Sequence, residues 1–195
     1  PTYDKYRNEL IFSIKNSEQT ITIAYDNAKN RWSTFYSFTP EAYCQMGSNI
    51  LSFKDGEVWI HGENSIRNNF YGEQYISKVT PVFNDKPEYL KVWNSCILMQ
   101  YQDNNENNWS APVIKNNNGQ LSRLKEGSWV KKGEHWYAAF KRDLNDLSVN
   151  QAIRISQGRA LRSTSLTAEL ENGYTGEVTL YGWLANWTNS ERTSK

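Results

Sequence analysis

Apolar and polar residues alternate through the first forty positions, which predicts paired β-strands. The run Arg31–Glu41 is the clearest stretch, because aromatic and β-branched residues suit a pleated, half-buried surface. Pro40 ends this run by withholding a ladder donor. We expect Phe35 on one side of the strand and, on the other side, Trp32, Thr34, Tyr36 and Phe38.

Neighbouring segments supply the strands that we expect to pair with this run. Leu10–Ile14 and Thr20–Tyr25 alternate with period two and are joined by a short polar turn. The segment Leu51–Ile60 predicts a hairpin, because Asp55-Gly56 can take the positive φ values of a tight turn. Strands joined by short turns form a meander, as in a propeller blade or a sheet shared with other chains.

Shorter strand signals follow beyond residue 74. The pattern predicts extended segments at Tyr75–Phe83, Tyr89–Trp93, Ser95–Tyr101, Pro112–Lys115, Trp129–Lys132, His135–Arg142, Arg159–Leu170 and Glu177–Trp187. In the last two, a core face is expected from Leu161, Leu166, Leu170, Val178, Leu180 and Leu184. A short helix at Leu144–Ile155, capped by Asn145 or Asp146, is the one helical prediction.

These elements predict an all-β protein with two parts. Residues 1–74 form a β-meander module, and residues 75–188 form a β-sandwich-like domain. Residues 189–195 are a polar tail. The boundary near residue 74 rests on a change in composition.

Aromatic residues replace aliphatic ones as core material. Mean hydropathy is −0.77 and only 38% of residues are apolar, but the chain has eight Trp, twelve Tyr and seven Phe. Each large ring buries about 150–250 Å². Asparagine clusters in loops such as 103–108 and 116–119, which favours strands linked by polar loops.

Charge is uneven although the net charge is only +1. Between Lys115 and Arg162 there are ten Lys or Arg and four Asp or Glu, a local excess of +6. We call this segment the basic block. It could meet nucleic acid or an acidic neighbour, but a solvated face or a subunit contact explains so mild an asymmetry more simply.

Two cysteines, Cys44 and Cys96, cannot make a disulfide framework, and we expect both to be reduced. No apolar run reaches the roughly 20 residues that span a bilayer. The sequence opens at Pro1 without an initiator Met, so we expect a fragment or processed piece of a longer polypeptide.

Little in the sequence favours catalysis. His61 and His135 are the only histidines, and no metal-binding spacing, nucleophile elbow or phosphate loop is present. We therefore predict a protein that is not an enzyme and binds no cofactor or metal.

The aromatic side chains offer contacts instead. Trp109 lies in an Asn-rich loop and is the strongest candidate for a ligand contact or an interface anchor. Stacking of such rings on sugars would make a glycan-binding module, although packing is the default role of rings in strands. The candidate interface or ligand contacts are Trp32, Tyr36, Trp59, Phe70, Tyr71, Trp109, Lys131 and Lys132.

Several motifs together resemble a known family. The segments 32–41 (WSTFYSFTPE), 52–61 (SFKDGEVWIH) and 69–72 (NFYG) are similar to a recurrent segment of large tail structural proteins of crAss-like bacteriophages. The segment 136–143 (WYAAFKRD), Gly158-Arg159 and the closing strand 178–187 resemble the C-terminal pattern of the same tail, or muzzle, proteins. The resemblance covers most of residues 8–187, and those proteins are much longer.

This resemblance implies a non-enzymatic component of the virion tail, in a ring around the DNA channel at the distal end. Its partners would be other copies of itself, other tail proteins, the upstream part of its own precursor and DNA in transit. A receptor- or glycan-binding module of the same tail is the alternative function, with a host-surface glycan or receptor as partner. We also expect Tyr6–Phe38 to complete a sheet shared with the upstream part or with a neighbour.

Overall fold

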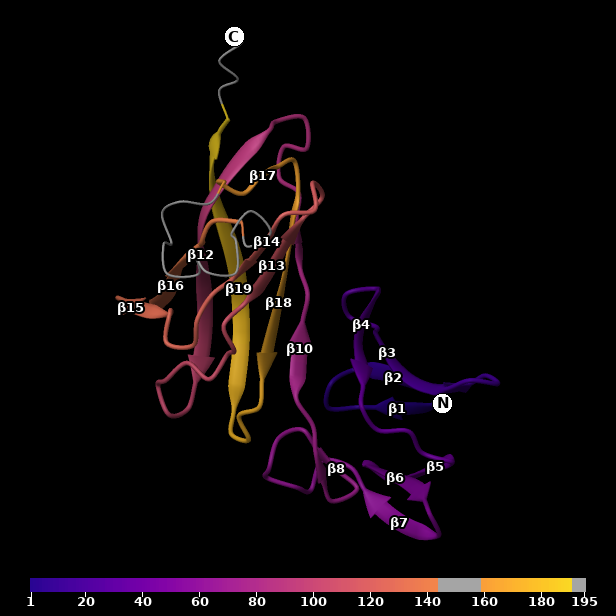
Figure 1. Ribbon diagram of the computed structural model, residues 1–195. Helices are drawn as coiled ribbons and strands as arrows, with labels where there is room; N and C mark the ends of the chain where they lie inside the picture. The colour runs from indigo at the N-terminus through magenta and orange to yellow at the C-terminus, as the bar shows by residue number, and fades with distance from the viewer. Residues whose placement is uncertain (144–158, 191–195) are drawn as a thin grey trace. The chain divides into compact units, whose positions relative to one another are not determined.

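The computed structural model describes residues 1–143 and 159–190 (Figure 1). It divides into two compact units, the N-terminal unit Pro1–Tyr75 and the C-terminal unit Ile76–Lys195. Every regular element within the described residues is a β-strand, which confirms the all-β prediction. No helix of the described part is long and apolar enough to cross a membrane. The predicted helix at Leu144–Ile155 lies outside the described residues.

The N-terminal unit contains three small antiparallel sheets. A four-stranded meander runs in the order β1-β2-β3-β4, followed by β5-β6-β7 and the two-stranded β8-β9. The strands are β1 (Thr2–Asp4), β2 (Glu9–Lys15), β3 (Thr20–Asp26), β4 (Arg31–Tyr36), β5 (Ala42–Met46), β6 (Asn49–Lys54), β7 (Glu57–Ile60), β8 (Asn69–Phe70) and β9 (Glu73–Gln74).

Two tight hairpins of this unit use left-handed backbone at both turn residues. Asp55 and Gly56 have φ values of 52° and 81°, which confirms the predicted hairpin between β6 and β7. Tyr71 and Gly72, at 56° and 79°, turn β8 into β9. A positive φ is rare for an aromatic residue, so the surrounding packing must hold Tyr71 there.

A β-bulge in β4 overturns one predicted pattern. Thr34 pairs with Ala24 and Trp32 pairs with Tyr25, so Ser33 is the extra residue. Because a bulge shifts the alternation by one residue, Trp32 lies on the same side as Phe35 and not with Thr34 and Tyr36. The expectation that Trp32 and Tyr36 share a face is therefore wrong.

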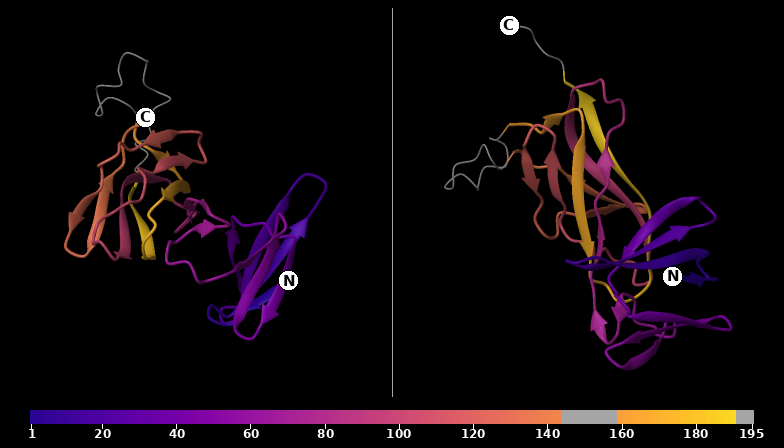
Figure 2. Two further views of the ribbon diagram at one scale, coloured as in Figure 1. Left: turned by 90° about the horizontal axis from the view of Figure 1, so that it is seen from below. Right: turned by 90° about the vertical axis from the view of Figure 1, so that its right-hand side faces the viewer.

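The C-terminal unit is built from two antiparallel sheets. One has β18 at its centre, paired with β10, β11 and β13, and β14 follows β13; the other has β12 at its centre, paired with β16, β17 and β19, and β15 follows β16. Figure 2 shows β12 and β19 running side by side. The strands are β10 (Ser77–Val79), β11 (Val82–Phe83), β12 (Lys91–Gln102), β13 (Val113–Asn116), β14 (Leu121–Arg123), β15 (Val130–Lys132), β16 (His135–Ala139), β17 (Arg162–Ser163), β18 (Leu166–Asn172) and β19 (Val178–Asn189).

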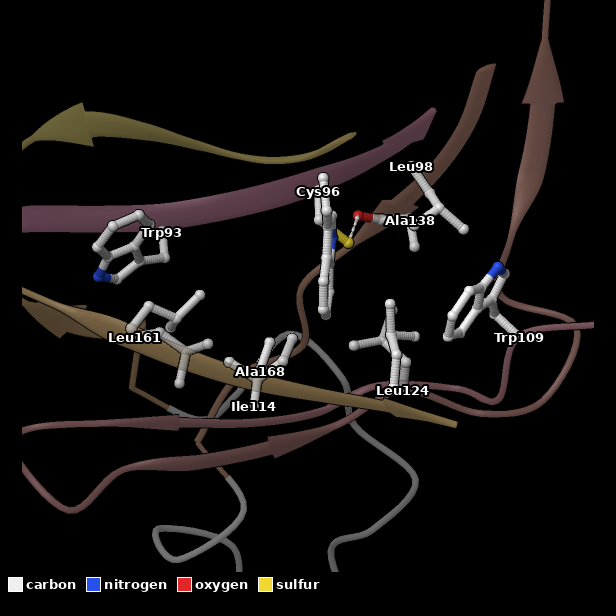
Figure 3. Packing of buried hydrophobic residues seen from close by; sticks show 12 residues of the cluster. Trp93, Cys96, Leu98, Trp109, Ile114, Leu124, Ala138, Leu161 and Ala168 are labelled. Carbon is white, nitrogen blue, oxygen red and sulfur yellow. Dashed lines mark hydrogen bonds between the residues drawn. The ribbon is translucent and has the colours of Figure 1, made fainter. Parts of the chain in front are cut away.

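One hydrophobic cluster fills this unit (Figure 3). Leu98, Ile114, Leu166 and Leu170 have no exposed surface. Cys96 lies among them, and burial raises the pKa of its thiol to about 12. Both cysteines are free, as predicted.

The predicted core leucines divide into two groups. Leu161, Leu166 and Leu170 are buried, as expected, and Val178 and Leu180 pack partly against the cluster. Leu184 is 51% exposed, contrary to prediction. The ladder to β12 skips Tyr181, and this bulge brings Trp183 inward in place of Leu184.

Strand limits differ from the prediction where the ladder is irregular. The predicted strands Tyr89–Trp93 and Ser95–Tyr101 are one strand, β12, with a register shift at Asn94. The predicted strand Arg159–Leu170 is two strands, β17 and β18, in different sheets. The short strands β1, β5, β8, β9 and β14 were not predicted.

Candidate functional site

The buried side of the β1–β4 meander is unusually polar. Glu9 and Asp26 are 8% and 7% exposed, and Thr22 is 1% exposed. Buried polar groups are costly unless they are hydrogen-bonded, and these are. The Asp26 carboxylate accepts bonds from the backbone N–H groups of Ala28 and Lys29, at 2.9 and 3.1 Å.

Glu9 organises the middle of this polar side. Its two carboxylate oxygens accept hydrogen bonds from Ser33 Oγ at 2.7 Å and Tyr36 Oη at 2.9 Å. Burial, and next the nearby Glu9 carboxylate, raise the pKa of Tyr36 well above its usual range. Tyr36 is therefore a fixed hydrogen-bond donor inside the unit.

The opposite side of the same sheet carries its large apolar residues. Register places them in three rows across the strands: Tyr3, Leu10, Tyr25 and Trp32; then Phe12, Ile23 and Phe35; then Ile14 and Ile21. We call these nine side chains the meander face. None is charged, and none is fully buried.

Several side chains of the meander face are strongly exposed. Trp32 is 57% exposed, Phe35 70% and Ile14 51%. Trp32 makes edge-to-face contacts with Phe12 and Tyr25, at centroid distances of 6.0 and 5.3 Å. A continuous exposed apolar surface of this kind typically marks an interaction site.

A second apolar surface lies on the C-terminal unit. Val130, Tyr137, Ile97 and Leu184 form one row across β15, β16, β12 and β19, on the side away from the core. Met99 and Tyr101 continue it along β12 by alternation. These six residues are the sandwich face. Val130 and Leu184 are 54% and 51% exposed.

The edge of the same sheet is also open. β19 pairs only with β12 among the described strands, although it is twelve residues long. Its sequence, VTLYGWLANWTN, contains no charged residue and no proline. Proteins usually protect such edges with lysine, proline or short strands. Here the bulge at Tyr181 is the one protective irregularity of β19.

The predicted contact residues of the N-terminal unit fall in different places. Trp32 is on the meander face, whereas Tyr36 is on the polar side. Phe70 and Tyr71 pack on the unit's own Phe38, at centroid distances of 4.9 and 6.4 Å. Trp59 is half-buried and meets Tyr71 edge to face at 5.4 Å. The structure does not bring these five rings together on one surface.

Trp109 is in a different position from the one expected. It is 7% exposed and belongs to the core cluster of its own unit, where Figure 3 shows it at the opposite end from Trp93. An isolated bridge to Asn172 in β18 draws its backbone toward the sheet. The expectation of a ring exposed to a ligand is therefore wrong for Trp109.

The lysines of the β15 hairpin are exposed and associated with rings. Lys131 Nζ lies 5.8 Å from the Trp136 ring centre, and Lys132 Nζ lies 5.5 Å from that of Tyr137. Lys131 also donates to Asn105 Oδ1 at 2.6 Å. Lys132 therefore lies at the sandwich face beside Tyr137, whereas Lys131 pairs with Trp136 on the other side of the sheet.

Groups suited to acid–base or metal chemistry are sparse in the described part. No cluster of three His, Cys, Asp or Glu residues that could hold a metal is present there. Nε2 of His61 lies 2.7 Å from Ser52 Oγ, and the ring lies 4.8 Å from that of Phe38. Burial lowers the pKa of His61, so its neutral form is favoured.

Most of both apolar surfaces was not singled out from the sequence. Alternation marked Leu10–Ile14 and Thr20–Tyr25 as strands, but alternation is the same whether the apolar side faces inward or outward. The polar residues on the other side of these strands were a usable signal of which side faces inward. Glu9, Ser13 and Asp26 each form hydrogen bonds with separate partners inside the unit.

Comparison with known proteins gave one family. Residues 65–143 match the Crassvirus muzzle protein C-terminal domain. The matched segment runs from just before β8 to just after β16 and contains three of the four strands of the sandwich face, β12, β15 and β16. A comparison with curated proteins gave no match. The match confirms the resemblance drawn from the sequence: over residues 65–143 the chain is similar to the C-terminal part of a muzzle protein of crAss-like phages, which indicates a structural component of the virion.

Proposed function

We propose that this chain is a structural component of a bacteriophage tail, within a ring-shaped assembly around the DNA channel at the distal end. It is part of a longer polypeptide, and its neighbours are other copies, other tail proteins and the upstream part of its own precursor. The similarity to a structural family also implies a non-enzymatic role.

The meander face is the observation that carries this proposal. Nine uncharged side chains in three rows remain accessible on one side of a four-stranded sheet. Burying apolar area is worth about 25 cal/mol per Å², so a neighbour that covers this face gains substantially from it. Interfaces of permanent assemblies are apolar in this way.

The basic block gives weaker support than the meander face, and it bears on the proposed position of the chain near DNA. Lys131 and Lys132 are exposed, and Arg142, Arg159 and Arg162 line a cleft of about 690 Å³. A channel through which DNA moves requires weak phosphate contacts, because each neutralised phosphate adds salt-dependent affinity. We therefore expect the isolated chain to bind duplex DNA weakly, with a shallow dependence on salt.

Cross-linking mass spectrometry of purified virions tests the proposal. Peptides of this chain should cross-link to one another and to other tail proteins, in amounts that correspond to several copies per particle. Virions that lack the chain, or in which its peptides cross-link only to capsid proteins, would contradict the proposal.

A receptor- or glycan-binding module is the alternative function. Sugar recognition needs an exposed ring with hydrogen-bonding groups beside it, but Trp109 is buried and Trp32 has Phe12 and Tyr25 as neighbours. No described contact specifically favours this alternative. A glycan array with the full chain would revive it if binding depended on Trp32.

A further inference from the structure

We propose that the meander face of one copy packs against the sandwich face of a second copy. The two surfaces are different parts of the chain, so the contact is head to tail. This inference deepens the proposed function and depends on it for the presence of neighbouring copies.

The two faces match in architecture. Each is the uncovered side of an antiparallel sheet, formed across β1–β4 in one case and across β15, β16, β12 and β19 in the other. Two such sheets stack about 10 Å apart, with strands within about 30° of each other, as in a sandwich. The contact would complete a sandwich between copies.

The two faces also match in size. Four strands spaced about 4.8 Å apart and about six residues long give each face a projected area of roughly 400 Å², half of the ~800 Å² that one partner contributes to a standard interface. The relief of the rings adds to this projected area. A contact of this size is therefore weak and depends on concentration.

Chemistry favours the same pairing. None of the nine residues of the meander face and none of the six of the sandwich face is charged. An uncharged face needs an uncharged partner, because burying an unpaired charge is costly. Lys132 lies beside Tyr137 at the rim of the sandwich face, where interfaces are usually polar.

The head-to-tail character has a direct structural consequence. A contact between two different surfaces leaves one surface of each kind free on every dimer, so further copies add in the same way. Such contacts build closed rings or open filaments. A contact between like surfaces would stop at a pair, which a ring around a channel cannot use alone.

A mixing experiment with two variants of the full chain tests the pairing. Phe35→Asp places a charge on the meander face, and Leu184→Asp places one on the sandwich face; both positions are exposed, so folding should be unaffected. Sedimentation velocity should show self-association of the wild-type chain, and each variant alone should associate at least about tenfold more weakly. An equimolar mixture should form a one-to-one dimer, because one intact face of each kind remains, and should grow no further.

Matched controls and outcomes make the test decisive. Tyr6→Asp and Tyr89→Asp introduce the same charge at exposed positions outside both faces, and should associate like the wild type. Trp32→Asp and Val130→Asp repeat the pair at second positions in case one variant misfolds. A variant that still dimerises alone, a mixture without a dimer or a monomeric wild type would overturn the pairing. The proposed function would stand if the chain were nevertheless present in virion tails, and would fail separately if it were absent from them.

Discussion

The two units differ in how much of their apolar surface they bury. In the C-terminal unit, leucines, isoleucine and tryptophans fill the space between two sheets, and Leu98, Leu166 and Leu170 have no exposed surface. In the N-terminal unit, the core cluster is small and consists of Ile11, Ala24, Phe38 and Ile50. The meander also turns Glu9 and Asp26 inward and leaves most of its large apolar side chains accessible. The C-terminal unit is built around a large core, whereas the N-terminal unit has a small core and an accessible apolar face, which we propose a neighbour covers.

This difference separates stability from assembly. Apolar residues stabilise a single chain only where that chain buries them, and the same residue types on the meander face stabilise a contact between chains. A residue's hydrophobicity alone therefore does not predict the effect of replacing it. The predictions below test this distinction, from the largest expected effect to the smallest.

Core truncation should give the largest loss. Leu166→Ala should lower the free energy of unfolding of the C-terminal unit by about 2–5 kcal/mol, because Leu166 is fully buried and a cavity remains. The matched variant Ile23→Ala, on the meander face, should cost far less in the dilute, isolated chain. Urea unfolding monitored by hydrogen-exchange mass spectrometry measures the unfolding of each unit separately. Equal losses of unfolding free energy for both variants would contradict the proposed difference between the core and the meander face.

The buried Lys91 should give the next largest effect. Its ammonium group donates to the carbonyl oxygens of Lys86 and Thr164 at 2.9 and 2.5 Å, and it lies over the rings of Trp93 and Trp187. Lys91→Met removes the partner of the Thr164 carbonyl and should cost about 1–3 kcal/mol, whereas the Lys86 carbonyl keeps the hydrogen bond that the Tyr89 backbone N–H donates at 3.1 Å.

An exposed lysine of the same unit provides the control for Lys91. Lys115→Met, in β13, should change stability by less than about 0.5 kcal/mol in the same urea titration. A Lys91→Met chain as stable as the wild type would mean that the Thr164 carbonyl finds another partner.

The titration of His61 should have a smaller effect on the stability of the N-terminal unit, and this effect should depend on pH. Burial lowers the pKa of His61 from 6.5, with Asp4 and Arg7 acting on it in opposite directions. His61 therefore binds a proton more readily in the unfolded chain than in the folded chain. The N-terminal unit should be most stable above about pH 6.5 and should lose stability as the pH falls below this value. His61→Gln should flatten the pH dependence of the thermal midpoint in this range. If the thermal midpoint of the variant depended on pH as in the wild type, His61 would not be the source of the pH dependence.

The smallest effect on stability should come from the most exposed ring. Phe35→Ser should change the unfolding free energy of the dilute chain by less than about 0.5 kcal/mol, since the side chain is 70% exposed. The same variant should nevertheless lose self-association in sedimentation experiments. A large loss of stability would show that the meander face already stabilises the isolated chain.

The sequence predicted the fold class and most strands, since period-two alternation and turn residues such as Asp55-Gly56 are local signals. It could not predict the bulges at Ser33 and Tyr181 or the register shift at Asn94, because one extra residue changes only the pairing register. Those bulges reversed the orientation of Trp32 and Leu184. Alternation also leaves open which side of a sheet is buried, so most of the meander face was missed, and Trp109 was misplaced because loop composition does not reveal its packing.

Radical footprinting of intact virions and of the isolated chain tests the central claim most directly. Trp32 and Phe35 should be oxidised readily in the isolated chain and strongly protected in the virion, whereas Tyr89, 43% exposed and outside both faces, reports the general effect of assembly. Protection of both meander-face rings well beyond that of Tyr89 is the predicted result. Equal oxidation of these rings in the virion and in the isolated chain would contradict the account.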